Sequence, residues 1–394
     1  MKRTLVAVGD VTDPNTWSGT PYHYWQAGKK AGFITSPATL DLKRISWQRY
    51  VWNAERILSG RKAGGFQYSH WFSRILESQI QNGCEADEYL SFNQFLPTAS
   101  FASNRGTKCS YYIDATMTDL LKSYKLGDTM AASTAQRALR KERENLEAAE
   151  RVIGFQRWAA NSILHDYGIS PDKVKTILPG ANLVLPDGFS FSDMRPGAGI
   201  DHPLRLCFIG KDWERKGLPL LAEVRSSLER RGLNVILCVI GGCPESLKDQ
   251  PGIDYKGFIN KNLEMEKFID VVKSCDMGCL FSTADASSIA VLEFLRLGLP
   301  VAGFVVDGMG DLLPPDATLR FNPSCGAEEI TDRIESLILN QEQLHELRQN
   351  ARLWSPLVSW ERCIREFQEL WATSVIQNPV RPWLGLSQHS KLLA

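Results

Sequence analysis

Short apolar runs alternate with helical segments through the second half of the chain, and this alternation constrains the fold more than any other feature. Between residues 203 and 303, the runs "LRLCFIG", "LNVILCVIGG", "DMGCLFST" and "LPVAGFVV" are separated by segments with helical periodicity. Strands that alternate with helices predict a parallel sheet covered on both faces. The first half repeats the pattern with longer interruptions, from "RTLVAVGD" to "KCSYYIDAT". We therefore predict an α/β protein with two parallel-sheet domains and a cleft between them.

Residues 186–202, "PDGFSFSDMRPGAGIDH", differ from their surroundings because they are rich in Pro, Gly, Ser and Asp and offer little to bury. Such composition is typical of a linker at a domain boundary. We expect an N-terminal domain over 1–185 and a C-terminal domain over 203–360, followed by a terminal helix and tail over 361–394. In "STAQRALRKERENLEAAERVIGF" we expect one charged helix that becomes apolar near its end.

Composition limits the function classes. The 394 residues suffice for roughly two to three domains. Forty-five basic residues balance 45 acidic ones, so net charge gives no argument for nucleic-acid binding. No apolar run approaches the ~20 residues that span a membrane, and the first apolar run is too short for a signal peptide. The nine cysteines lack C-x-x-C or metal-ligand spacing. We expect a cytoplasmic protein with reduced thiols, no metal and no resident cofactor.

Ligands of open parallel sheets bind at the carboxyl ends of strands, against helix N-termini. The first place of this kind is "GKDWERKG", which follows a predicted strand and opens a helix. Lys211, Arg215 and Lys216 put three cations on this turn, where they can neutralise an anionic ligand. The alternative is a solvated turn.

The second place is "STADASSIAVLEFLRLGLPVAG", in which Asp285 and Glu293 lie eight positions apart. We expect Asp285 in the loop before a helix, whose first N–H groups, at Ser288, Ile289 and Ala290, would face phosphates. The alternative is that Asp285 caps the helix and that Glu293 is a polar residue with a structural partner. Glu293 sits within an apolar run, where a carboxylate is costly to bury without a partner, and this favours a functional role.

The third place is "DPNTWSGTPYH", between the first strand and the first helix. Gly19 allows close approach of a ligand to the backbone at a helix start. A plain turn explains the stretch equally well, because the chain has no G-x-G-x-x-G motif.

Residues 42–74 combine seven basic residues and interleaved aromatics with a single acid, Glu55. Such a segment can rest on an anionic bilayer and admit a lipid-linked acceptor. The alternative is an amphipathic helix whose aromatics belong to the core and whose cations are solvated.

Four stretches, "DYGISPDKVKTILPGAN", "FIGKDWERKG", "DASSIAVLEFLRLGLPVAG" and "SGTPYH", resemble in their order and spacing the motifs of retaining, family-4-type glycosyltransferases, the glycosyl transferases of group 1. The third is similar to the E-x7-E signature followed by Gly-x-Pro-Val. The resemblance implies the GT-B fold, in which two Rossmann-like domains face each other across a cleft and a C-terminal helix returns to the N-terminal domain. It also implies metal-independent, retaining transfer of a sugar, expected to be a hexose, from a nucleoside-diphosphate sugar to a hydroxyl acceptor.

The resemblance implies roles for individual residues. Lys216 matches the lysine that contacts the donor pyrophosphate, and Glu293 the glutamate that holds the ribose hydroxyls. Asp285 takes the place of the glutamate that binds donor-sugar hydroxyls, and it is one methylene shorter. Lys211 stands at the family's arginine position, and Arg215 lies close enough to replace it.

Three further positions follow from the same resemblance. Asp114 stands where many members carry a histidine; a catalytic base, an acceptor-positioning residue and a structural residue are all open roles for it. Backbone groups of Phe258 and Ile259 fall where the family often grips the nucleobase.

Two other function classes remain open. A nucleotide-sugar epimerase of the same fold would keep the diphosphate site but need water or a base in place of the acceptor. A non-catalytic nucleotide-sugar-binding protein would explain the departures at Asp285, Lys211 and Asp114. The expected partners are a nucleotide-sugar donor and a hydroxyl acceptor (a saccharide, a small molecule or a lipid-linked glycan), not nucleic acid. The expected location is the cytoplasm, with peripheral contact to the inner face of a membrane through residues 42–74; the oligomeric state is open.

Overall fold

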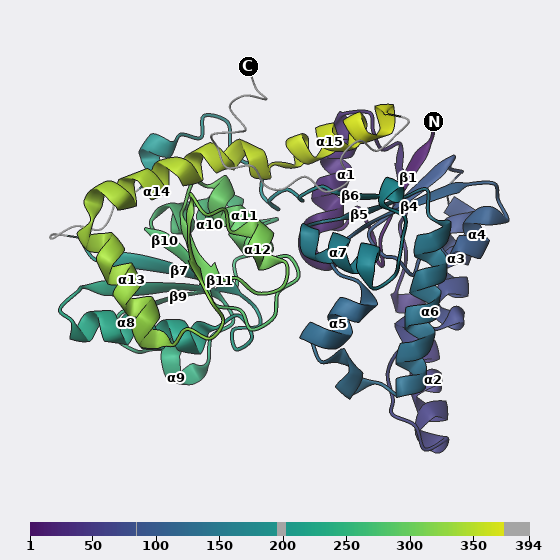
Figure 1. The fold of residues 1–394 in the computed structure, drawn as a ribbon, viewed down its shortest axis with the longest axis horizontal. Coiled ribbons are helices and arrows are strands. Elements are labelled where there is room, and N and C mark those ends of the chain that lie inside the picture. The colour runs from purple at the N-terminus through teal and green to yellow at the C-terminus, as the bar shows by residue number, and fades with distance from the viewer. Residues whose placement is uncertain (84, 195–201, 374–394) are drawn as a thin grey trace. The chain divides into compact units, whose positions relative to one another are not determined.

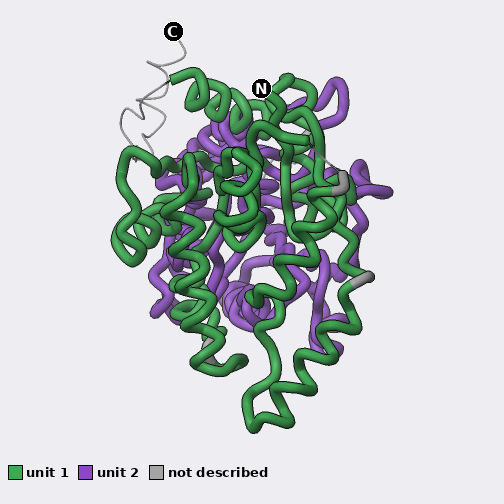
Figure 2. The backbone as a smooth tube through the Cα atoms, turned by 90° about the vertical axis from the view of Figure 1, so that its right-hand side faces the viewer, with its two compact units in different colours: residues 1–180, 360–381 green, residues 181–359, 382–394 purple. Residues whose placement is uncertain are grey.

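The computed structural model describes residues 1–83, 85–194 and 202–373 (Figure 1). The chain forms two compact units, coloured separately in Figure 2. Unit 1 contains Met1–Gly180 and the described residues from Trp360 onward, and unit 2 contains Ala181–Ser359. The sequence placed the boundaries after residues 185 and 360. Residues 195–201 of the expected linker and 374–394 of the expected tail lie outside the described residues.

Unit 1 is built on a six-stranded parallel sheet in the order β2-β1-β3-β4-β5-β6. The strands are β1 (Arg3–Val6), β2 (Ser36–Pro37), β3 (Glu88–Ser91), β4 (Lys108–Ile113), β5 (Arg151–Gly154) and β6 (Val174–Thr176). The expectation that "ERVIGF" ends a helix is wrong: α6 (Ala132–Ala148) stops before it, and Arg151–Gly154 form β5. The apolar residues that appeared to extend the helix are the buried strand that follows it.

Helices cover both faces of this sheet (Figure 1). On one face, α1 (Thr20–Lys30) and α15 (Trp360–Ala372) share a core with the strands. On the other face the core includes α3 (His70–Gly83), α6 (Ala132–Ala148) and α7 (Arg157–His165). The remaining helices of unit 1 are α2 (Ser46–Leu58), α4 (Ala99–Ser103) and α5 (Met117–Ser123). The C-terminal helix thus packs on the N-terminal unit, as the resemblance implied.

Phe367 of α15 shows how that helix is held. Its side chain is fully buried, with ring centroids 5.3 Å from Tyr24 and 4.9 Å from Tyr112. Aromatic pairs at this spacing add to the gain from apolar burial. The chain therefore leaves unit 1 at Gly180, passes through unit 2 and returns with α15 to complete the core of unit 1.

Unit 2 carries a second six-stranded parallel sheet, in the order β12-β11-β10-β7-β8-β9. Its strands are β7 (Leu204–Gly210), β8 (Val235–Gly241), β9 (Ile253–Gly257), β10 (Met277–Leu280), β11 (Val301–Phe304) and β12 (Thr318–Phe321). Its helices are α8 (Leu218–Arg230), α9 (Glu245–Lys248), α10 (Met265–Lys273), α11 (Ile289–Arg296), α12 (Met309–Leu312), α13 (Ala327–Leu339) and α14 (Gln341–Trp354). In Figure 1, α8 and α13 lie on one face of the sheet and α10 and α11 on the other. The predicted α/β class and the two parallel sheets are confirmed.

Across the described residues, no helix combines the length and apolar character that crossing a bilayer requires.

Candidate donor site

Two loops meet at the carboxyl edge of the unit 2 sheet, because β7 and β10 are neighbours there. Gly217, at the start of α8, has a φ of +79°, and a Cβ at this position would lie 2.3 Å from the carbonyl oxygen of Phe281. Only glycine fits this contact. The backbone N–H of Thr283 donates to the carbonyl of Arg215 at 2.9 Å. The loop after β7 is thereby joined to the loop after β10.

Lys216 and Asp285 form an ion pair across these two loops. Lys216 Nζ lies 2.7 Å from Asp285 Oδ2 and 3.2 Å from Ser288 Oγ. The Ser282 hydroxyl also donates to Asp285 Oδ2, at 3.1 Å. Both side chains of the pair are largely shielded from water, with 15% and 7% of their area exposed. A cation and a carboxylate are thus placed side by side at the edge where parallel sheets bind ligands.

The N-terminus of α11 lies beside this pair. The helix begins at Ile289, so Asp285 is in the preceding loop, as predicted, and Ser288 is the N-cap without a side-chain cap hydrogen bond. Ser287 Oγ is buried and makes no hydrogen bond to any residue that the structure describes. The N–H groups at Ile289 and Ala290 belong to the first turn, where a helix favours anions. The alternative that Asp285 caps the helix is not what the structure shows.

Glu293, just over one turn into α11, is 2% exposed. Its carboxylate is paired with Lys261 Nζ, which also donates to the carbonyl of Asn182 at 3.3 Å. Burial raises the pKa of Glu293, and the nearby Lys261 charge opposes this rise. The sequence anticipated that a buried carboxylate here needs a partner. It did not identify Lys261, which lies before α10, because no local pattern links two residues so far apart.

The other predicted cations point to different parts of the site. Arg215 Nη1 donates to the carbonyl of Ala284, and Arg215 Nε pairs with Asp212 at 2.8 Å. Lys211 Nζ lies 4.8 Å from the ring centroid of Phe258. Arg215 therefore binds the segment that carries Asp285, and Lys211 contacts the segment after β9.

The two positions after β9 differ in exposure. Phe258 presents an exposed ring, 61% accessible, whereas Ile259 is buried at 4%. An exposed aromatic face with a cation over it is a suitable platform for a flat heteroaromatic ring.

Asp307 is a residue of this site that sequence reasoning missed. It follows β11, the strand next to β10, and its Oδ2 accepts a hydrogen bond from the backbone N–H of Asp285 at 3.0 Å. Its φ of 47° is a left-handed conformation that non-glycine residues seldom adopt. Strained backbone of this kind concentrates at functional sites. The only sequence signal was its place just after a predicted strand.

In unit 1, Gly19 lies in a loop with three consecutive left-handed residues: Trp17 at φ 46°, Ser18 at 57° and Gly19 at 89°. Gly19 is the N-cap of α1, and a Cβ there would lie 3.0 Å from the carbonyl of Pro14. The loop follows β1 and is more strained than the plain turn considered from sequence.

Asp114 directly follows β4 in unit 1, and its backbone carbonyl accepts from Gln156 Nε2 at 3.1 Å. The loop that follows Asp114 is held by hydrogen bonds to Glu142 of α6. The Glu142 carboxylate accepts from the backbone N–H of Met117 at 2.9 and 3.0 Å and from Gln94 Nε2 at 2.8 Å. Gln94 Nε2 also donates to the carbonyl of Ala115 at 3.1 Å. This buried network joins the loops that follow β3 and β4.

Three thiols from distant parts of unit 2 also come together. The Sγ atoms of Cys207, Cys238 and Cys275 lie within 4.8 Å of one another, and all three residues are buried. Cys207 and Cys238 are register partners on β7 and β8, so sheet pairing, not motif spacing, brings them together. Such a group can in principle hold a thiophilic ion. The eight described cysteines are all free thiols.

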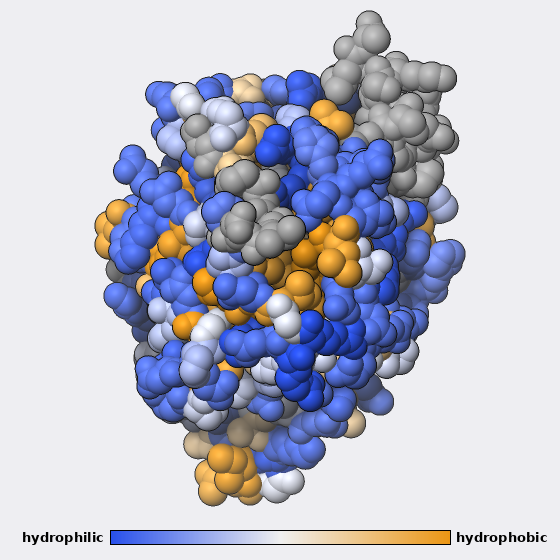
Figure 3. Space-filling view, turned by 90° about the vertical axis from the view of Figure 1, so that its left-hand side faces the viewer, coloured by the Kyte–Doolittle hydropathy of each residue, from blue (hydrophilic) through white to orange (hydrophobic). Residues whose placement is uncertain are grey.

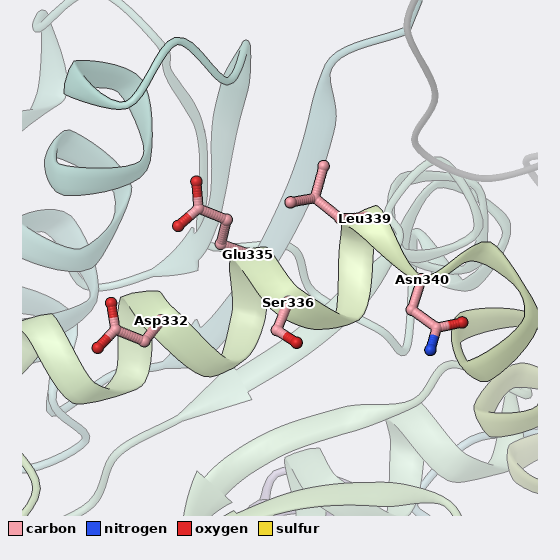
Figure 4. A pocket seen from close by; sticks show the side chains of 5 residues that line it. All are labelled: Asp332, Glu335, Ser336, Leu339 and Asn340. Carbon is pink, nitrogen blue, oxygen red and sulfur yellow. The ribbon is translucent and has the colours of Figure 1, made fainter.

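A separate surface hollow lies along α13 (Figure 4). It is lined by Asp332, Glu335, Ser336, Leu339 and Asn340. Arg231 pairs with Asp332 and with Glu335, each at 2.7 Å. None of the predicted site residues lines it.

Comparison with solved structures defines the fold class. The chain is similar over 94% of its length to sucrose-phosphate synthase from Thermosynechococcus elongatus, with 12% identity, a TM-score of 0.66 and 98% of that chain covered. It is similar, also over 94%, to Anabaena Alr3699/HepE in complex with UDP-glucose, with 12% identity, a TM-score of 0.60 and 100% of that chain covered. The fold is therefore GT-B.

The sequence comparisons find similarity to one family of enzymes. Residues 192–354 match the model of the glycosyl transferases group 1. The D-inositol 3-phosphate glycosyltransferase of Gordonia bronchialis is 23% identical over 262 residues, covering 62% of this chain and 57% of that protein. The enzyme of the same name from Saccharomonospora viridis is 24% identical over 236 residues, covering 56% and 55%. Residues 192–354 are thus similar to the glycosyl transferases of group 1. The chain spans little more than half the length of these curated relatives.

The Glu142 network makes unit 1 sensitive to pH. Burial, the largest cause, raises the pKa of Glu142 to about 7 against hydrogen bonds from Tyr167, Gln94 and Met117, which lower it. Because the folded-state pKa lies above the unfolded one, the stability contribution is greatest below about pH 4.5 and is lost as pH rises towards about 7. We expect wild-type unfolding free energy to fall by about 3 kcal/mol at most across this window, and Glu142→Gln to lack this slope.

Urea unfolding at a series of pH values measures the difference. Glu144→Gln is the matched control, because Glu144 is exposed on the same helix. A Glu142→Gln variant with the same pH slope as the Glu144→Gln variant would contradict the assignment.

Proposed function

We propose that this protein transfers a sugar from a nucleoside-diphosphate sugar to a hydroxyl acceptor, with retention of anomeric configuration and without a metal ion. The observation that carries the proposal is the Lys216–Asp285 pair at 2.7 Å. In a nucleotide sugar the anomeric carbon is bonded directly to the diphosphate. A cation for phosphate and a carboxylate for sugar hydroxyls must therefore be neighbours, and here they are.

The remaining residues of the site suit the nucleoside part of the donor. The Glu293 carboxylate would accept hydrogen bonds from ribose hydroxyls, and Lys261 would keep it ionised. The exposed ring of Phe258 and the neighbouring Lys211 would bind the base and the charge beside it. The first N–H groups of α11 and the Ser287 hydroxyl would receive phosphate oxygens.

The chemistry then follows from charge development. The bond between the anomeric carbon and the phosphate oxygen breaks, and the acceptor oxygen bonds to the same face of that carbon. The acceptor proton passes to the departing phosphate, so no protein base is needed. Lys216, Arg215 and the helix N–H groups stabilise the negative charge that grows on the diphosphate. Asp114 is then an acceptor-positioning residue, oriented by the loop that Glu142 and Gln94 hold.

The acceptor is proposed only as a hydroxyl compound. The curated relatives are named for D-inositol 3-phosphate, which makes a cyclitol phosphate the first small molecule to test beside saccharides and lipid-linked glycans. UDP-glucose, which Anabaena HepE holds, is the first donor to test.

Lys216→Ala is expected to lower donor turnover by about 100-fold or more, because one charge-stabilising group at a developing oxyanion has effects of that size. The measurement is release of nucleoside diphosphate from a donor panel with and without acceptor. Lys267→Ala is the control, because Lys267 is an exposed lysine of α10, and this variant should behave as wild type. Wild-type turnover by the Lys216 variant would refute the site; epimer formation without acceptor would favour the epimerase, and nucleotide binding without turnover the binding protein.

Glu293 and Asp285 should separate in their effects, because they are expected to hold different ends of the donor. We predict that Glu293→Gln weakens binding of free nucleoside diphosphate about tenfold, whereas Asp285→Asn leaves that binding unchanged and alters the choice among donor sugars. Isothermal titration with the diphosphate, followed by turnover of several sugars, tests this. Equal loss of diphosphate binding in both variants would rule out the division of roles.

Asp307 should act through Asp285. Asp307→Gly tolerates the left-handed φ but removes the acceptor for the Asp285 N–H, and Asp307→Asn keeps an acceptor and tolerates that conformation. For Asp307→Gly, the loss of one such hydrogen bond predicts a roughly threefold to tenfold drop in kcat/KM, with diphosphate binding unchanged. For Asp307→Asn we expect near wild-type values. If Asn loses as much as Gly, the hydrogen bond is not what matters.

A further inference from the structure

Helix α2 of unit 1 turns its apolar side to the solvent. Its large apolar residues recur three to four positions apart, so they share one side of the helix. They are exposed to unusual degrees: Trp47 59%, Tyr50 67%, Val51 48%, Ile57 64% and Leu58 89%. Single exposed apolar residues are ordinary, but a continuous exposed stripe marks an interaction surface.

The opposite side of α2 is firmly packed, so the exposure of the stripe does not come from fraying of the helix. Trp52 Nε1 donates to the carbonyl of Gly64 at 2.9 Å, and the Trp52 ring packs 6.1 Å from Phe66. Arg56 is 1% exposed and lies 4.4 Å above the Trp52 ring. Gln48 is also buried. The helix therefore buries a side with Gln and Arg and exposes a side with Trp, Tyr, Ile and Leu.

The structural alternative for residues 42–74 holds for part of the segment. Trp52 and Trp71 pack against the unit 1 core, as the structural alternative required. Trp47 and Tyr50 are largely exposed, although the Trp47 ring centroid lies 6.0 Å from that of Trp71. The exposed stripe also includes Val51, Ile57 and Leu58, which the aromatic pattern had not singled out.

Exposed basic residues lie near this stripe in the sequence. Lys43, Arg49, Arg61 and Lys62 are exposed on α2 and beside it. Glu55 is the one acidic residue between positions 42 and 74. A second copy of the same face would bring these cations together at an interface, which is unfavourable. An anionic surface complements them.

We propose that the exposed side of α2 docks this protein on the surface of an anionic lipid bilayer. Trp47 and Tyr50 suit the boundary between head groups and acyl chains, where aromatic residues with a polar edge are favoured. Ile57 and Leu58 enter the apolar layer, and the flanking lysines and arginines meet lipid phosphates. Figure 3 shows the hydropathy of another face of the protein, the left-hand side of Figure 1, whereas α2 is drawn at the right of Figure 1. The helix lies along the interface and does not cross it.

The docking surface belongs to unit 1 and shares no residue with the donor site of unit 2. Its existence does not depend on the proposed reaction. If both hold, membrane docking favours an acceptor that is itself anchored in lipid.

Co-sedimentation with vesicles tests the proposal on the full chain. Wild type should pellet with vesicles of phosphatidylcholine and phosphatidylglycerol, and much less with phosphatidylcholine alone. Raising the salt from ~0.1 M to ~1 M shortens the screening length from about 10 to about 3 Å and should release most of the protein. Trp47→Ser/Leu58→Ser should weaken binding about tenfold or more, and Arg49→Gln/Lys62→Gln should weaken it only for anionic vesicles.

Leu339→Ser is the matched control, because Leu339 is 72% exposed in unit 2; it should bind vesicles as wild type does. Circular dichroism checks that the variants fold, and nucleoside-diphosphate binding should be unchanged in all of them. No binding of wild type to anionic vesicles at low salt would overturn the proposal. So would equal binding by the Trp47→Ser/Leu58→Ser variant, or a wild-type dimer in solution that this variant converts to a monomer, which would assign the face to a second copy of the chain.

Discussion

The ion pair between Lys216 and Asp285 depends on the order of strands in the unit 2 sheet. β10 lies beside β7, so two loops 69 positions apart in sequence meet at one edge. Gly217 lets the start of α8 approach the carbonyl of Phe281. A side chain at that position would push the Lys216 loop away from the β10 loop. The pairing of charges is thus a consequence of sheet topology and one close backbone contact, and the proposed donor site rests on both.

Much of unit 2 could be predicted from sequence because its strands are short apolar runs with clear ends. The position of Asp285 in a loop before α11 followed from the same pattern, and the structure confirms it. The residues that bind Glu293 and Asp285 could not be predicted from this pattern. Lys261 and Asp307 come from loops that only the tertiary fold brings to Glu293 and Asp285. Their roles depend on distance in space, about which periodicity says nothing.

Unit 1 was harder to predict for two physical reasons. At the end of α6 the apolar residues of β5 continue the helical pattern, so only sheet pairing separates strand from helix. In α2, periodicity shows that the helix has an apolar side but not which side meets the core. Trp47 and Trp52 are the same residue type on one helix, yet Trp52 packs inside and Trp47 faces outward. On the packed side the Arg56 guanidinium lies 4.4 Å from the Trp52 ring centroid, and a cation–π contact of this kind has no sequence signature.

The short side chain of Asp285 is compatible with its proposed role because the loop that carries it is held on several sides. Its backbone N–H is bound by Asp307, its carboxylate by Ser282 and Lys216, and the preceding carbonyl of Ala284 by Arg215. Lys216 and Asp285 neutralise each other, so a donor must offer each a partner of similar strength, a phosphate for the lysine and hydroxyls for the aspartate. Only a ligand that presents both groups next to each other replaces the whole pair. Free sugar would occupy Asp285 and leave the Lys216 charge without its partner in a site shielded from water, and that cost favours the intact nucleotide sugar.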